Sequence, residues 1–229
     1  MKRAFILATI IWALACMPAT AGTIVNFKVS GLSFDVELYD ADAPLTVANF
    51  LNYVNAGAYD NSIIHRSTTY NAAQVQVIQG GAYAWNASNQ LYAIPTSDPV
   101  INEPGLLNER GTIAMAKLGG DPDSATSQWF FNVQDNPNLD LPANNGGFTV
   151  FGHVTDAAGL AAIDAIAGLY VAGQYQLPDL PPELVEAPLI QANNQVFFVT
   201  VDSVAVVPEP SAIVLATVGI GIALSRRRK

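Results

Sequence analysis

The residues most able to do chemistry lie in the segment SIIHRSTTYNAAQVQVIQGG, residues 62–81. His65 and Arg66 are adjacent near its start, and Gln79 precedes a glycine pair at its end. The segment has no acid, no Cys and no second His, so it offers neither a proton-transfer pair nor a metal-ligand set. What remains is an isolated guanidinium, a permanent positive charge that donates several hydrogen bonds.

The composition of residues 22–207 limits the partners of this cation. This part carries four basic and eighteen acidic residues, a net charge of −14. Such a surface repels phosphate backbones, so we expect no nucleic-acid partner. The two His residues are too far apart in the sequence to form a metal-binding motif. Asp121 and Asp123 are more typical of a solvated turn than of a calcium-binding loop. We therefore predict no metal and no other cofactor.

The first 21 residues have the pattern of a secretory signal. Lys2 and Arg3 precede an apolar run over residues 4–15, and the small residues 19–21 suit a signal peptidase. We therefore expect residues 1–21 to be removed and the following domain to lie outside the cytoplasm. The alternative is a lipoprotein acylated at Cys16, which is the only Cys of the chain.

The C-terminal residues 208–229 form a second special segment. Pro208-Glu209-Pro210 precedes an apolar run over residues 211–224, about 21 Å long as a helix against a hydrocarbon core of about 30 Å, and four cations follow. This order resembles the PEP-CTERM sorting signal of Gram-negative bacteria. The resemblance implies removal by an exosortase-type protease and delivery to the periplasm, cell surface or extracellular matrix. The alternative is a simple membrane anchor.

Between these ends, periodicity predicts a mainly β domain. Alternating runs flank Ser30-Gly31, which indicates a hairpin, and helical spacing indicates helices over residues 44–57 and 157–169. Short β-type runs and two helices favour a closed or nearly closed β-barrel with helices covering its ends. A proline-rich surface loop is predicted over residues 173–188. The β-type runs are 62–67, 74–81, 111–116, 127–133, 148–154 and a closing strand over 195–207.

Four blocks in order resemble the cyclophilins: IIHRS with VIQGG, INEPGLLNERGTIAMAK, SATSQWFFNV, and NLD with GGFTVFGHV. The likeness runs from about Thr23 to Val206, which is the whole domain between the two terminal segments. It implies a closed eight-stranded antiparallel barrel capped by two helices, and it implies peptidyl-prolyl cis-trans isomerase activity on proline-containing polypeptides, here exported or surface ones.

This activity would explain the isolated cation. An amide bond resists rotation by about 18–20 kcal/mol, and twisting it needs neither a nucleophile nor proton transfer. A fixed guanidinium that holds the lone pair of the proline nitrogen stabilises the twisted state more than the planar one. Arg66 matches the family's catalytic Arg, whereas His65 matches a neighbouring His with a structural role.

The resemblance also assigns substrate-binding positions. Gln79 would bind the substrate backbone and help to hold Arg66, and Phe130 would form the floor of the proline pocket. Val77 and Leu139 would form its walls. The implied substrate-binding residues are Gln79, Gln128, Phe130, Val77, Leu139, Ala116 and Phe148.

Several positions depart from the family pattern. Arg66 and Gln79 stand 13 residues apart, farther than in the family, and Gln76 and Asn138 replace aromatic residues. Phe148 replaces a His or Tyr and cannot donate a hydrogen bond. These changes motivate two alternatives: a non-catalytic cyclophilin-like peptide-binding module of the extracellular matrix, and a purely structural matrix protein. Taken singly, Arg66 could be a surface ion pair, and the apolar pocket residues could be ordinary core.

Overall fold

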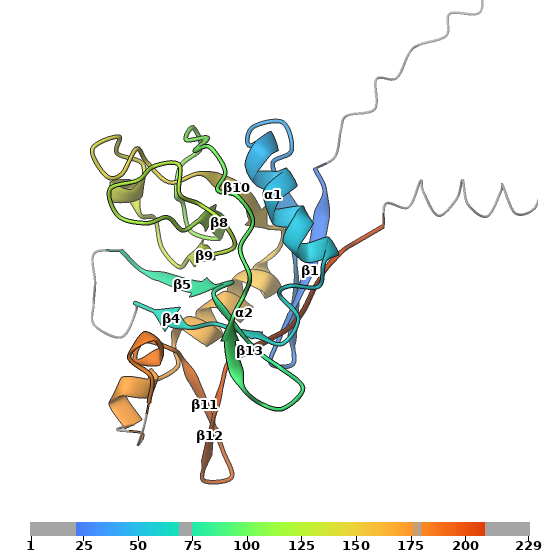
Figure 1. The fold of residues 1–229 in the computed structure, drawn as a ribbon, viewed down its shortest axis with the longest axis vertical. Coiled ribbons are helices and arrows are strands. Elements are labelled where there is room, and N and C mark those ends of the chain that lie inside the picture. The colour runs from blue at the N-terminus through green and yellow to red at the C-terminus, as the bar shows by residue number, and fades with distance from the viewer. Residues whose placement is uncertain (1–21, 69–74, 176, 178–179, 209–229) are drawn as a thin grey trace, which may run out of the picture.

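The computed structural model describes residues 22–68, 75–175, 177 and 180–208 (Figure 1). The predicted signal segment and nearly all of the predicted sorting tail lie outside the described residues, and their fate stays a prediction. Among the residues described, no helix is both long and apolar enough to cross a membrane.

The predicted N-terminal hairpin is present. Strands β1 (Ile24–Val29) and β2 (Leu32–Leu38) pair antiparallel. Ser30 and Gly31 between them both have positive φ, 47° and 84°, as a two-residue hairpin turn of matching twist requires. The alternating side chains of both strands then bury one face.

Eleven strands of the described chain form one sheet, in the order β4-β5-β9-β8-β10-β2-β1-β13-β3-β6-β7. Every pairing in this sheet is antiparallel. The remaining strands are β3 (Ser62–Ile63), β4 (Arg66–Ser67), β5 (Val77–Gly80), β6 (Tyr83–Trp85), β7 (Leu91–Ala93), β8 (Thr112–Met115), β9 (Trp129–Asn132), β10 (Val150–Val154) and β13 (Thr200–Val206).

The prediction of a closed eight-stranded barrel is wrong. The sheet is an open half-barrel, and its two end strands are β4 and β7. The chain changes partners between β3 and β4. The N–H of Ile64 donates to the Val199 carbonyl at 3.0 Å, but the N–H of the next residue, His65, donates to the Gln79 carbonyl at 3.0 Å. The continuous chain from β3 to β4 therefore connects the two parts of the sheet at the point where a closed barrel would have hydrogen bonds between neighbouring strands.

Both predicted helices are present as α1 (Pro44–Asn55) and α2 (Ala157–Ala167). Pro44 suits the first turn of α1 because its missing N–H would have no helical partner there. The carboxylate of Asp156 caps α2 by accepting the Gly159 N–H at 2.7 Å. Both helices bury one apolar face against the sheet.

The main core is aromatic and lies on the inner face of the sheet. Phe27 stacks on Phe34 with ring centroids 5.6 Å apart and meets Trp129 edge-on at 5.3 Å. Phe50 of α1 and Phe131 of β9 complete the cluster. These rings are 5% exposed or less, so this face is closed to solvent.

The C-terminal region differs from its prediction. Residues 173–188 are not simply a surface loop, because Leu184 and Ala187 are buried. The predicted closing strand is two strands: β12 pairs with β11 in a separate hairpin, and β13 pairs with β1. Asn193 and Asn194 form the hairpin turn with φ of 51° and 61°, an Asn-Asn signal that the sequence analysis missed. The elements are η3 (Ala172–Tyr175), η4 (Pro182–Leu184), β11 (Leu189–Ala192) and β12 (Gln195–Phe198).

Candidate active site

Four side chains stand in one row across four neighbouring strands. Arg66 of β4 is opposite Gln79 of β5, Gln79 is opposite Phe130 of β9, and Phe130 is opposite Ala114 of β8. Residues directly opposite in antiparallel strands project from the same face. The register therefore brings the cation, the amide and the aromatic ring to one side of the sheet.

This side is the outer one, because side chains alternate along a strand. Trp129 and Phe131 belong to the main core, whereas Phe130 between them belongs to a small separate apolar cluster. The buried members of this cluster are Val77, Ala114, Phe130, Leu139 and Val150. Phe130 is thus buried but lies outside the main core.

A pocket of about 200 Å³ opens above this cluster. It is apolar at its base and has the guanidinium and an amide at its rim. Seven of the eight residues assigned from sequence line it, whereas Gln128 does not. Val75 and Lys117 were missed, although Lys117 directly follows the predicted Ala116. The pocket is lined by Arg66, Val75, Val77, Gln79, Ala116, Lys117, Phe130, Leu139 and Phe148.

Gln128 contacts the site through Gln79. The Gln79 Nε2 atom donates to Gln128 Oε1 at 2.9 Å, which turns Gln79 Oε1 toward Arg66. The Arg66 Nη1 atom lies 3.5 Å from that oxygen, a long contact for a hydrogen bond. Gln128 therefore orients the amide, and Gln79 on its own holds Arg66 only loosely.

The glycine pair after Gln79 permits the close approach of β5 to β9. A Cβ on Gly80 would lie 2.7 Å from the Trp129 ring. One on Gly81, which has φ of +82°, would lie 2.4 Å from the Ser127 carbonyl oxygen. Neither position accepts a side chain without a shift of the core.

Arg66 also forms an ion pair. Its Nε donates to Glu186 Oε2 at 2.6 Å, with the two side chains 46% and 35% exposed. The surface ion pair that we considered as an alternative role for Arg66 therefore exists together with the pocket. The Nε edge of the guanidinium contacts Glu186 while the residue lines the cavity.

His65 lies next to the site but is not in the pocket lining. Its side chain is buried and packs edge-on against Tyr83 at 5.6 Å. Burial, and secondarily the charge of Arg66, lowers the pKa of His65 to about 4. The imidazole is therefore neutral at neutral pH, which fits the structural role expected for it.

Lys117 and Phe148 form the far side of the pocket. Lys117 Nζ donates to the carbonyl of Asn145 at 2.8 Å and to that of Gly147 at 2.5 Å, and it lies 4.8 Å from the centre of the Phe148 ring. Burial lowers the pKa of Lys117, although the charge of Asp123 acts in the opposite direction. Phe148 meets Phe130 edge-on at 5.9 Å and extends the aromatic base.

A buried polar network lies beside this base, because Asn132 and Phe130 are two residues apart on β9 and share one face of the sheet. Asn136 Nδ2 donates to Asn132 Oδ1 at 2.7 Å and to the Gln76 carbonyl at 3.0 Å. The Gln76 N–H donates back to Asn136 Oδ1 at 3.0 Å. Gln76 and the exposed Asn138, the two replaced aromatic positions, are both outside the pocket lining. Their substitution leaves the base of the pocket intact.

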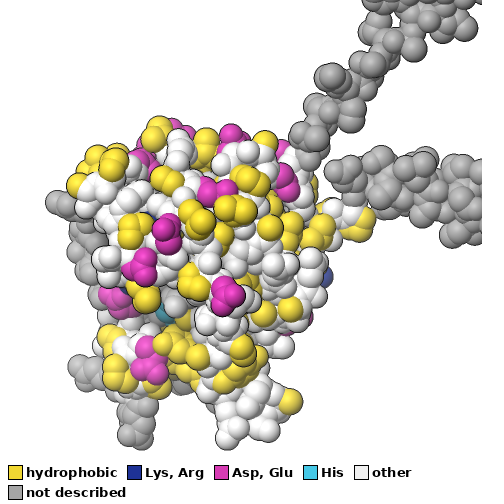
Figure 2. Space-filling view, turned by 45° about the horizontal axis from the view of Figure 1, so that its top comes forward, with side chains coloured by type: hydrophobic (Ala, Val, Ile, Leu, Met, Phe, Trp, Pro, Cys, Tyr) yellow, Lys and Arg dark blue, Asp and Glu magenta, His cyan; other side chains and the backbone are white. Residues whose placement is uncertain are grey.

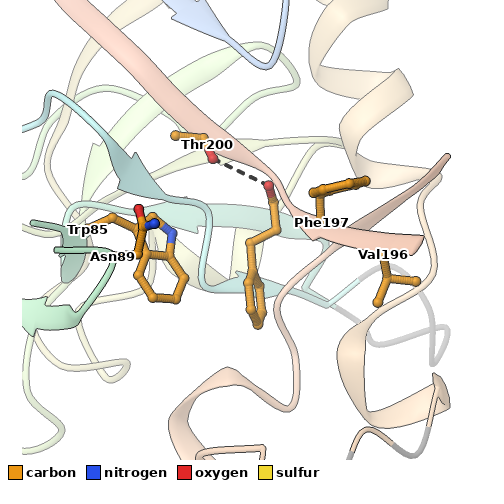
Figure 3. A pocket seen from close by; sticks show the side chains of 6 residues that line it. Trp85, Asn89, Val196, Phe197 and Thr200 are labelled. Carbon is orange, nitrogen blue, oxygen red and sulfur yellow. Dashed lines mark hydrogen bonds between the residues drawn. The ribbon is translucent and has the colours of Figure 1, made fainter. Parts of the chain in front are cut away.

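A second cavity, of about 350 Å³, lies between β6 and β12. Figure 3 shows Trp85 and Asn89 on one side of it and Val196 and Phe197 on the other, with Thr200 Oγ1 donating to the Phe198 carbonyl at 3.4 Å. None of its lining residues is ionisable. It is larger than the Arg66 pocket but carries no charge that could act on an amide, so we take the Arg66 pocket as the candidate site.

The acidic turn has no cluster of metal ligands. Asp121 Oδ1 accepts the Asp123 N–H at 3.2 Å, and Asp123 Oδ1 accepts the Asn102 N–H at 2.9 Å. Across the part of the chain that the structure describes, no three His, Cys, Asp or Glu side chains gather where a metal could bind.

Comparison with known proteins gives one consistent result. Residues 24–182 match the family model "Cyclophilin type peptidyl-prolyl cis-trans isomerase/CLD". The chain is 35% identical over 179 residues to a peptidyl-prolyl cis-trans isomerase of Acinetobacter baylyi, covering 77% of this chain and 90% of that protein. It is 37% identical over 178 residues to peptidyl-prolyl cis-trans isomerase A of Dickeya dadantii, covering 76% and 87%.

Among solved structures, a cyclophilin type peptidyl-prolyl cis-trans isomerase of Cryptosporidium parvum superposes with a TM-score of 0.55. The superposition covers 82% of this chain and 99% of that one, at 18% sequence identity. At this identity the likeness establishes the fold alone.

Proposed function

The chain belongs to the cyclophilin-type peptidyl-prolyl cis-trans isomerase family, which confirms the predicted enzyme class, and we propose that Arg66 is its catalytic residue. In this proposal the guanidinium donates to the nitrogen of a twisted X-Pro amide bound in the pocket. The observation that supports it is the row Arg66–Gln79–Phe130, which sets a permanent cation at the rim of an apolar cavity.

The geometry suits each proposed step. The proline ring rests on Phe130 between Val77 and Leu139, which are apolar and 4–7% exposed. Twisting localises a lone pair on the proline nitrogen, so a donor at the rim stabilises the twisted state more than the planar one. Gln79 binds the substrate backbone, and Ala116 contributes main-chain contacts on the opposite side of the pocket.

The test is substitution of Arg66 itself. Arg66→Ala lowers kcat/KM on a proline peptide by about two to three powers of ten, the scale of one preorganised donor at about 2.7–4 kcal/mol. Arg66→Lys restores little, because an ammonium cannot reproduce the planar fork of donors. We expect circular dichroism to show both variants folded, since the side chain is 46% exposed and little of its packing is lost.

Arg110→Ala is the matched control. Arg110 also forms an exposed ion pair, with Asp164, but it is not in the pocket lining. We expect the Arg110→Ala variant to keep the wild-type kcat/KM. Equal rates for folded wild type and Arg66→Ala would remove Arg66 from the mechanism.

One feature favours a second role, as a peptide-binding module. Phe148 replaces a residue that could donate a hydrogen bond, so one wall of the pocket offers only ring surface and the Lys117 ammonium. Calorimetry with a proline peptide, run beside the isomerase assay, separates the two roles. Tight binding without turnover would favour the module.

We further propose that the substrates are exported or surface polypeptides with proline. The support is the signal-like segment 1–21, the tail 208–229 and the acidic domain between them, whose Asp and Glu side chains spread over the face seen in Figure 2. In this proposal signal peptidase and an exosortase-type protease remove the two terminal segments, which alone contact the membrane, and the domain resides in the periplasm, at the cell surface or in the extracellular matrix.

Intact mass spectrometry of protein extracted from the cell surface tests this proposal. We expect an N-terminus at Gly22 and a C-terminus near residues 208–211. Retention of residues 226–229 on most molecules would instead indicate a membrane anchor.

A further inference from the structure

The strand that carries Arg66 is supported from outside the sheet. β4 stands at the end of the strand order, and among the residues that the structure describes it pairs within the sheet only with β5. On its other side the Ser67 N–H donates to the Glu186 carbonyl at 2.7 Å. The Glu186 carboxylate then accepts the Arg66 Nε–H at 2.6 Å. One residue thus partners two consecutive residues of β4.

The segment that presents Glu186 is firmly attached to the fold. Its neighbours Leu184 and Ala187 are 1% and 0% exposed. The Ala172 N–H donates to the Ala187 carbonyl, and the Gly173 N–H donates to the Val185 carbonyl, both at 2.8 Å. Because the chain is held on both sides of Glu186, its backbone has little freedom to move and presents the carboxylate beside β4.

Arg66 needs such support because its other contact is weak. Gln79 Oε1 lies 3.5 Å away, and nearly half of the Arg66 side chain is exposed. A free Arg side chain samples many rotamers, and ordering it costs about 2 kcal/mol. Glu186 contacts Nε, which leaves the terminal nitrogens of the guanidinium free of that carboxylate and available to a substrate.

We propose that Glu186 is a positioning residue that holds the Arg66 guanidinium in its catalytic orientation. This rests on the role of Arg66 proposed above. Glu186 lies beyond residue 182, where the family match ends, so the support comes from a part of the chain outside the matched region. Because orientation matters most in the twisted state, losing it lowers kcat more than it changes KM.

The kinetic test uses Glu186→Ala and Glu186→Gln. We expect Glu186→Ala to lower kcat about tenfold with KM changed by less than about twofold, because a misdirected donor still allows the substrate to bind. Glu186→Gln keeps most of the activity, because its amide oxygen can accept the same Nε–H bond. The control is Glu183→Ala, which removes an exposed acid from the same segment and leaves kcat unchanged.

A second readout does not depend on turnover. In the ¹⁵N-labelled full-length protein, the Arg66 Nε–H resonance is assigned by its loss in Arg66→Lys. We expect slow hydrogen exchange of this group in wild type and in Glu186→Gln, and fast exchange in Glu186→Ala. Asp164→Asn, which alters the ion pair of Arg110, should leave the resonance unaffected.

The outcomes separate this proposal from the proposed mechanism. Wild-type kcat in folded Glu186→Ala, or a rise of kcat in both Glu186 variants, would overturn the positioning role, as would fast Nε–H exchange in wild type. If Arg66→Ala keeps its activity, the catalytic role of Arg66 fails. The exchange measurement still decides in that case whether Glu186 holds the guanidinium.

Discussion

The two faces of strands β5, β8 and β9 are built from alternate residues of the same backbone, but the inner face forms the core and the outer face forms the candidate site. The inner face is filled, with Ile78, Ile113 and Phe131 at 1% exposure or less. The outer face bears Gln79 and Phe130 and leaves a cavity of about 200 Å³ beside a cation. The rigid inner face fixes the strands, and the outer face can then keep an unfilled, polar-rimmed site.

The largest expected effect is a loss of stability, and it should differ between Phe130 and Phe131, which are neighbours on opposite faces of β9. Phe131→Ala leaves a sealed cavity in the main core and lowers the free energy of unfolding by about 3–5 kcal/mol. Phe130→Ala enlarges a pocket that already opens to solvent, so we expect about 1–3 kcal/mol. Phe130→Ala should also lower kcat/KM at least about tenfold, through lost proline contact. Urea unfolding and the peptide assay measure the two quantities.

Equal loss of stability in the two variants would contradict the comparison. It would mean that the outer cluster is as essential to folding as the main core. Phe151→Ala, a second fully buried position, supplies the reference for a core truncation.

A somewhat smaller effect is the pH dependence of stability that His65 causes. This residue is next to Arg66 in the chain, but its side chain is buried. Its folded pKa of about 4 is below the ordinary 6.5, so between these values the unfolded chain binds a proton that the folded chain does not. Stability is therefore lost as pH falls from about 6.5 to 4, by at most about 3 kcal/mol. His65→Gln should flatten this part of the stability profile.

Isomerase activity behaves differently from stability, because the guanidinium stays protonated and no acid-base pair takes part. The kcat/KM of folded protein should be nearly constant from about pH 6 to 9. A bell-shaped profile in that range would point to a titrating catalytic group.

The smallest expected effect is on inhibitor affinity at the rim of the outer face. The resemblance to the cyclophilins implies that cyclosporin sensitivity depends on a Trp-type residue at the position of Asn138. In this chain Asn138 is an exposed amide beside Leu139. We expect weak binding by wild type. Asn138→Trp should tighten Kd about tenfold, or about 1.4 kcal/mol. Nanomolar binding by wild type would show that another residue forms this wall.

The local elements were predictable because their signals are local. Pro44 and Gly57 bracket α1, and Ser30-Gly31 turns the first hairpin, each through its own backbone preference. The ordered blocks around Arg66 and Phe130 likewise sufficed for the family. Strand alternation could not show which strands are neighbours, so the open sheet was missed. The β11–β12 hairpin was missed for a different reason, because the local turn signal of Asn193 and Asn194 was overlooked.

The sequence by itself determined the chemistry available: one guanidinium without an acid-base partner nearby in the chain, and apolar residues to surround a proline. Only the tertiary structure decided what that guanidinium contacts. Arg66 and Glu186 are 120 residues apart and meet because the fold places Glu186 against the edge of β4 that is not paired with β5. Such a contact depends on strand order and long-range packing, which residue types and periodicity do not encode.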